Sequence, residues 1–150
     1  EANCMDVLWV DNDVFNYLCK ADCLQAVLQS APYRLCTTEL VQGEAEAAGP
    51  ALQSAVNAMR QGTITVHPLG KPPLDAPLNR VGGLSPADQS LIACAQNLGG
   101  QVLTNDKRLI SQCASESVGC KPFVKFLEEC EQNGWLSSQT IERLRLLCGA

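Results

Sequence analysis

Three observations in the sequence predict an α/β fold with a mainly parallel central sheet. Short apolar runs with β-branched residues alternate with longer segments of helical periodicity over most of the chain. Strands separated by helices form βαβ units, and right-handed crossovers in such units place successive strands parallel. The chain has 150 residues, of which 46% are hydrophobic, enough for one domain to bury a sizeable core.

The first part of the chain is predicted to alternate strand, helix, strand and helix. Residues 5–10 form an apolar run typical of a short buried strand, and helical periodicity follows over 12–30 with a break near residue 21. A weak strand at 34–36 precedes a helix over 38–48, which a threonine can cap at its start.

A third helix and strand precede a long connection. Gly49 and Pro50 end the preceding helix and open another that reaches residue 60, and the β-branched run 63–66 predicts a strand. Residues 68–83 contain four prolines and are expected to form a loop. A loop of this length is typical of either a substrate lid or a simple connector, and both interpretations stay open.

The clearest helix begins after this loop. Ser85 is placed to cap it, Pro86 occupies its first position, and two glycines at 99–100 end it. The apolar run 101–104 predicts a buried strand, and helical pattern resumes over 106–115.

The last part of the chain is predicted to be mainly helical. A short extended piece around Val118 is followed by helices over about 122–132 and 137–148. We expect one domain over the whole chain, with a core at about 5–120 and a C-terminal helical extension at 121–150.

Composition limits the classes of function. Sixteen acidic residues outnumber eleven basic ones, and the net charge of −5 argues against binding of nucleic acid through an extended positively charged surface. No run approaches the roughly 20 apolar residues of a membrane span, so no membrane association is expected. Nine cysteines without a CxxC pair make a poor disulfide framework, so we expect reduced, mostly buried thiols in a cytoplasmic protein.

Met5 would make a natural start, which leaves open whether residues 1–4 are native.

Two aspartates follow predicted strands directly. Asp11 comes after the strand ending at residue 10, and Asp106 comes after the strand ending at residue 104. Open parallel sheets bind ligands beyond the carboxyl ends of their strands, so these carboxylates are candidate site residues. Each aspartate also precedes a helix, and a purely capping role is an equally good interpretation of either one alone.

Two further acids lie beside apolar helix faces. Asp88, three residues after Ser85, fits a capping box but also flanks the apolar stripe of its helix, where an unpaired carboxylate is costly. Helical spacing likewise predicts that Glu44 shares the apolar face of its helix, while Glu39 and Glu46 face water.

Four converging carboxylates would form an acidic pocket. Mutual repulsion would raise their pKa values unless a cation lay among them, and an all-oxygen donor set suits Mg²⁺ or Mn²⁺, as one ion or two. Such a site can activate water and stabilise the leaving oxygen of a phosphodiester. Lys107 and Arg108 could contact phosphate there, although surface cations usually only interact with water.

Four segments together resemble the PIN-domain family. They are Val-Asp-Asn-Asp-Val-Phe at 10–15, Thr-Glu-Leu-Val-Gln-Gly-Glu at 38–44, Leu-Ser-Pro-Ala-Asp-Gln-Ser-Leu-Ile-Ala at 84–93 and Val-Leu-Thr-Asn-Asp-Lys-Arg-Leu at 102–109. Their order matches the family over about residues 6–120, and the block 84–109 is the most specific part.

The resemblance implies a Rossmann-like three-layer α/β/α sandwich and a metal-dependent endoribonuclease that cuts RNA with metal-activated water. By position, the acidic quartet matches Asp11, Glu44, Asp88 and Asp106, and Thr104 matches a nearby hydroxyl. Many bacterial members are VapC-like toxins, often homodimeric and blocked by an antitoxin protein. Asp13, an additional acid where the family commonly has Ser, Thr or Asn, and the longer C-terminal part depart from the family pattern and weaken the toxin interpretation.

Two other functions fit parts of the sequence. Asp11 and Asp13 resemble the first motif of haloacid-dehalogenase-like phosphatases, as nucleophile and general acid, but that family also needs a lysine, a strand-end hydroxyl and a later acidic pair. A PIN-like fold could also serve as a non-catalytic RNA- or protein-binding module, because a fold does not fix its function.

Overall fold

A five-stranded parallel sheet forms the centre of the protein. The computed structural model describes residues 6–69 and 83–150, so residues 1–4 and most of the loop expected at 68–83 lie outside the described residues. The strands are β1 (Asp6–Val10), β2 (Tyr33–Thr38), β3 (Thr65–His67), β4 (Gln101–Thr104) and β5 (Cys120–Pro122).

The strand order fixes where a ligand site can form. The order is β3-β2-β1-β4-β5, with every neighbouring pair parallel. The chain builds outward from β1 in one direction through β2 and β3, then returns to the other side of β1 with β4 and β5. The topological switch point therefore lies between β1 and β4, where adjacent strands diverge into connections on opposite faces.

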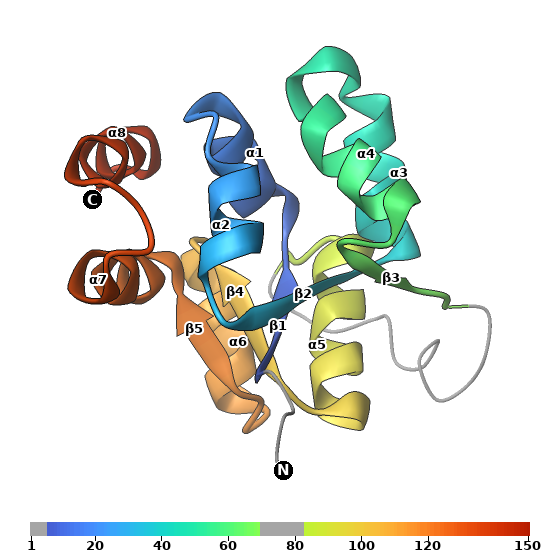
Figure 1. The fold of residues 1–150 in the computed structure, drawn as a ribbon. Helices are drawn as coiled ribbons and strands as arrows, with labels where there is room; N and C mark the ends of the chain where they lie inside the picture. Colours follow the sequence, from blue (N-terminus) through green and yellow to red (C-terminus); the bar gives the residue numbers. More distant parts are fainter. Residues whose placement is uncertain (1–5, 70–82) are drawn as a thin grey trace, which may run out of the picture.

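Helices cover both faces of this sheet, as the predicted three-layer arrangement requires. Figure 1 shows α1 and α2 on one side and α5 and α6 on the other, while α3 and α4 extend beyond the carboxyl end of β2. The helices are α1 (Asn12–Lys20), α2 (Leu24–Ser30), α3 (Glu39–Ala47), α4 (Gln53–Gln61), α5 (Pro86–Leu98), α6 (Lys107–Ser115), α7 (Phe123–Asn133) and α8 (Ser138–Cys148), with a 3₁₀ turn at Gly49–Leu52. No helix among the described residues is long and apolar enough to cross a membrane.

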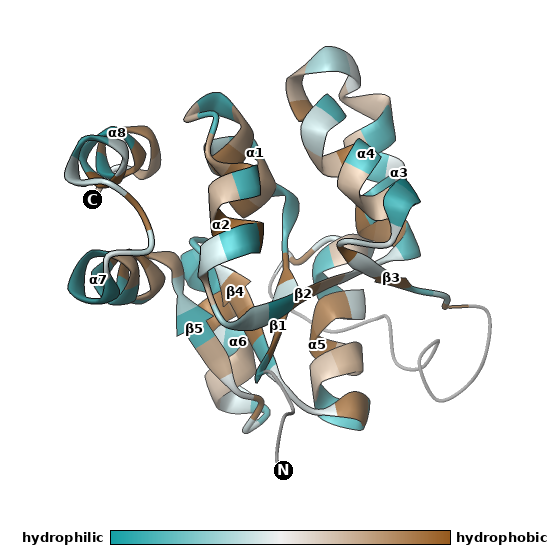
Figure 2. Ribbon diagram, in the orientation of Figure 1, coloured by the Kyte–Doolittle hydropathy of each residue, from teal (hydrophilic) through white to brown (hydrophobic). Residues whose placement is uncertain are grey.

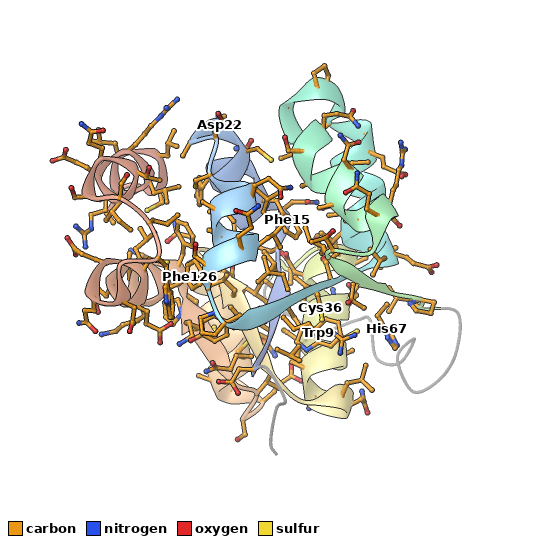
Figure 3. The ribbon with its side chains drawn as sticks, in the orientation of Figure 1. Trp9, Phe15, Asp22, Cys36, His67 and Phe126 are labelled. Atoms are coloured by element: carbon orange, nitrogen blue, oxygen red, sulfur yellow. The ribbon has the colours of Figure 1, made fainter. Side chains whose placement is uncertain are left out.

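The core lies between these layers. Buried apolar residues of the strands and helices form this core, and hydrophobic and hydrophilic residues alternate along the helices that cover the sheet (Figure 2). Trp9 lies next to α5, where its indole N–H donates to the Gly99 carbonyl at 2.8 Å and its ring meets His67 edge-on (Figure 3). At Gly100 a Cβ would lie 2.8 Å from the Val7 carbonyl oxygen, so only glycine fits the turn into β4.

Two strand positions differ from the sequence prediction. The extended piece expected around Val118 is instead part of the turn that closes α6, since the Val118 N–H donates to the Cys113 carbonyl at 2.8 Å. The strand itself is β5, whose Cys-Lys-Pro sequence has little β propensity and is set by pairing with β4. Similarly, β3 begins at Thr65 rather than residue 63, because the Ile64 N–H is held by the Ala58 carbonyl of α4.

Candidate functional site

An acidic cavity opens at the carboxyl end of the sheet, at the switch point between β1 and β4. Its volume is about 180 Å³. All four acids of the predicted quartet, together with Asp13, line this one cavity. The complete lining is Asp11, Asn12, Asp13, Val41, Glu44, Ser85, Ala87, Asp88 and Asp106.

Asp11 is the most deeply buried of these acids. It directly follows β1 and is 4% exposed. One carboxylate oxygen caps α1 by accepting from the Val14 N–H at 3.0 Å, and the other is hydrogen-bonded to the Thr104 hydroxyl. Burial raises its pKa to about 7 despite these bonds, and the charges of Asp13 and Asp88 add to the rise. Capping therefore accounts for only one of the two oxygens.

Asp106 reaches the cavity from the segment after β4. Its backbone N–H donates to the Thr104 hydroxyl at 3.0 Å, and its carboxylate accepts from the Arg108 N–H at 2.8 Å, which caps α6. The Arg108 guanidinium lies 3.7 Å from the same carboxylate and is largely exposed. Lys107 is exposed and does not line the cavity. Of the two predicted cations, only Arg108 therefore contacts the acidic group.

Asp88 combines the two roles that its sequence position suggests. It lies in the first turn of α5, and its N–H donates to the Ser85 hydroxyl at 3.1 Å. Its carboxyl is half-buried in the cavity wall. Burial and the charge of Asp106 raise its pKa, while hydrogen bonds with Ser85 lower it. The same helix start thus caps α5 and supplies an acid to the cavity.

Glu44 lines the cavity but does not lie on a buried helix face. The prediction that it shares the apolar face of α3 is wrong, because Glu44 is exposed and its neighbour Leu40 is 38% exposed. Only Val41 and Ala45 of α3 are buried. Glu46 faces solvent as predicted, paired with Arg60 at 3.3 Å. Glu39 is also exposed and accepts from the Leu69 N–H at 3.1 Å.

Asn12 is a site residue that the sequence analysis missed. Its amide nitrogen donates to the Val41 carbonyl at 3.1 Å and to the Glu44 carboxylate at 3.0 Å, which joins the start of α1 to α3. Its amide oxygen is buried and has no hydrogen-bond partner among the residues that the structure describes. In the sequence, only its place between two acids directly after a strand pointed to Asn12. An amide at that place offers both a hydrogen-bond donor and an acceptor beside the carboxylates.

The electrostatics of the cavity favour a hard cation. Five carboxylates line it, and none of its described lining residues is lysine, arginine or histidine. Burial raises the pKa of Asp13 as well, with Asp106 adding to the shift. No group of three or more His, Cys, Asp or Glu among residues 6–69 and 83–150 is already arranged to hold an ion. The donor set and the unsatisfied Asn12 oxygen nevertheless fit Mg²⁺ or Mn²⁺, which prefer oxygen ligands.

A larger cavity elsewhere carries a different charge pattern. It measures about 320 Å³ and lies between β5 and α7. Its ions pair with each other, since the Lys121 ammonium lies 2.7 Å from the Glu129 carboxylate, which also accepts from the Tyr33 hydroxyl at 2.6 Å. The unbalanced acids at the switch point therefore make the smaller cavity the better candidate site.

Comparison with known proteins identifies the fold. No family model and no curated protein matches the sequence. A PilT N-terminus domain protein from the hyperthermophilic archaeon Sulfolobus solfataricus P2 superposes with a TM-score of 0.61 at 20% identity, covering 82% of this chain and 92% of that one. The PIN domain endonuclease Utp24 superposes with a TM-score of 0.52 at 17% identity, covering 74% and 80%. The chain therefore has the PIN-domain fold that the sequence resemblance implies.

Proposed function

We propose that this protein is a metal-dependent endoribonuclease whose quartet Asp11, Glu44, Asp88 and Asp106 holds Mg²⁺ or Mn²⁺. The observation that carries the proposal is the gathering of these acids, with Asp13, in one cavity at the switch point of the sheet. When bound, the ion would lower the pKa of a water molecule and offset negative charge on the phosphodiester. The fold shared with a PIN domain endonuclease supports a nuclease.

The side chains around the acids have supporting roles in this proposal. The Thr104 hydroxyl fixes one oxygen of Asp11, and the Asn12 amide fixes Glu44, so each acid is held before substrate arrives. The exposed guanidinium of Arg108 lies at the rim beside Asp106, where it can contact a phosphate oxygen. The resemblance that implies a nuclease also implies RNA as the substrate.

The charges near Asp11 favour the nuclease over a haloacid-dehalogenase-like phosphatase. That phosphatase needs a lysine beside the phosphoryl group, and no lysine is among the described residues that line the cavity. Both oxygens of Asp11 are also engaged, one by the Val14 N–H and one by Thr104, which is unfavourable for a nucleophile. An antitoxin protein, a homodimer and a cytoplasmic location stay predictions of the sequence.

RNA cleavage by a matched set of variants tests the proposal. The purified wild type should cleave RNA with Mg²⁺ or Mn²⁺, and Asp88→Asn should lower the rate by about a hundredfold or more, because a ligand of the proposed ion loses its charge and the ion stabilises the transition state. Glu46→Gln is the control, because Glu46 lies on α3 near Glu44 but faces solvent. The proposal is wrong if the wild type cuts neither RNA nor single-stranded DNA with either metal, or if Asp88→Asn cuts as fast.

A further inference from the structure

The last residue of β4 and the two residues after it connect to two different parts of the molecule. Thr104 is hydrogen-bonded to Asp11, and Asp106 lines the acidic cavity. Asn105 lies between them in sequence but bonds outside the cavity. Its amide nitrogen donates to the Cys148 carbonyl at 3.1 Å and to the Tyr17 hydroxyl at 3.4 Å. A single side chain therefore joins the Thr104–Asp106 segment to the last residue of α8.

The helix at the other end of this bond is firmly packed. Ile141 and Leu144 of α8 are buried. Tyr17, the second acceptor of Asn105, packs its ring 5.4 Å from that of Phe123 at the start of α7. The last carbonyls of a helix have no partner within the helix, so the Cys148 oxygen is a ready acceptor for a fixed donor. Asn105 therefore donates to the last turn of a helix that packs on the domain through Ile141 and Leu144.

A second bond attaches α8 to α1 at a place away from the cavity. The Arg143 guanidinium donates to the carbonyl of Lys20, the last residue of α1, at 2.9 Å. The Asn105 and Arg143 bonds both attach α8 to the domain, but only Asn105 adjoins a residue that lines the acidic cavity. Removing the Asn105 bond should therefore affect the site, whereas removing the Arg143 bond should affect only the attachment of α8.

We propose that Asn105 is a positioning residue, which fixes Thr104 and Asp106 by holding their segment against α8, and that α7 and α8 thereby support the acidic site. The expected effect of Asn105 on the cleavage rate rests on the proposed nuclease function. Its role in holding the Thr104–Asp106 segment does not. Because small displacements of site groups weaken catalysis strongly, loss of this bond should act on turnover more than on substrate binding.

The first arm of the test compares Asn105→Ala with Arg143→Ala in the full chain. Asn105→Ala should lower kcat for RNA cleavage about tenfold or more with little change in KM, because a displacement near 1 Å can cost up to about a hundredfold. Arg143→Ala, the matched control, should stay within about twofold of the wild type. Equal losses in the two variants would overturn the inference, since they would show that α8 contributes only through overall stability.

The second arm measures amide hydrogen exchange and needs no activity. The Asp106 N–H, held by Thr104, and the Arg108 N–H, held by Asp106, should exchange faster in Asn105→Ala and at the wild-type rate in Arg143→Ala. In Asn105→Ser, whose side chain is too short to reach both acceptors, the exchange rates of these two amides should lie between those of the wild type and of Asn105→Ala. This variant replaces Asn105→Ala in the test if the alanine variant does not fold. Unchanged exchange in both Asn105 variants overturns the inference. A wild type that cleaves no RNA, combined with faster exchange in Asn105→Ala, would refute the nuclease and leave the support role of Asn105 standing.

Discussion

At the scale of single residues, Asp11 carries an electrostatic cost, because its carboxyl is buried beside other acids. Its carboxyl is 4% exposed, and burial raises its pKa from 3.8 to about 7. The folded state therefore holds a proton between these pH values that the unfolded chain has released. The free energy of unfolding of the metal-free protein should fall as pH rises through this window, by roughly 1.4 kcal/mol per unit at most.

This pH dependence can be measured by urea unfolding between pH 4 and pH 8 with a chelator present. Asp11→Asn should remove most of the decline and make the metal-free protein more stable than the wild type near pH 8, because an amide carries no charge to bury. Identical pH profiles for the two proteins would mean that Asp11 is ionised without penalty in the fold.

Asn12 provides a second test at this scale, because it is the donor that holds Glu44. Asn12→Ala removes that hydrogen bond, and Asn12→Asp replaces it with repulsion between carboxylates. A hydrogen bond to a charged group contributes about 1.5–3 kcal/mol, so kcat/KM for RNA should fall about tenfold in the alanine variant and further in the aspartate variant. Asn97→Ala, which alters an amide on α5 away from the cavity, should leave kcat/KM unchanged.

At the scale of elements, the start of α5 links stability to the site. Ser85 caps this helix and also hydrogen-bonds Asp88. Ser85→Ala should lower the free energy of unfolding by about 1 kcal/mol through loss of the cap. It should also lower the rate of RNA cleavage, because the Asp88 carboxylate loses its hydrogen bond with the Ser85 hydroxyl. Replacing Ser137, which caps α8 in the same way, should affect stability alone. A Ser137→Ala variant with the same loss of activity would contradict this interpretation.

The elements that the sequence predicted best are those with local signals. The start and end of α5 follow from a serine cap, a proline at the first position and two glycines, all visible in the sequence. The strand β5 was misplaced because its position depends on pairing with β4, a contact distant in the sequence. Spacing alone also misjudged Glu44, because α3 extends beyond the sheet and leaves much of its apolar stripe exposed.

The candidate site was predicted in part for a similar reason. Strand ends and parallel topology were enough to bring Asp11 and Asp106 together at one edge of the sheet. The place of Asn12 between two acids was visible in the sequence, but its bond to Glu44, 32 positions away, was not. The bond from Asn105 to α8 spans 43 positions and was likewise beyond reach of local pattern.

At the scale of the whole molecule, the net charge of −5 includes five carboxylates gathered in one cavity. RNA binding should therefore depend on metal ions and on few direct phosphate contacts. A plot of log(kcat/KM) against log[KCl] should have a slope shallower than about −3, whereas a protein with 6–10 phosphate contacts gives a much steeper one. A slope near −6 or beyond would show that a broad cationic surface binds the RNA.

The central claim is that the acidic cavity binds a divalent ion and that this ion is required for RNA cleavage. The most direct measurement titrates Mn²⁺ into metal-free protein and follows calorimetric binding and RNA cleavage at the same concentrations. We predict that binding and cleavage rise with the same midpoint in the wild type and in Glu46→Gln, and that both are lost in Asp88→Asn. Cleavage that persists in excess chelator, or Mn²⁺ binding that is unchanged in Asp88→Asn, would contradict the claim.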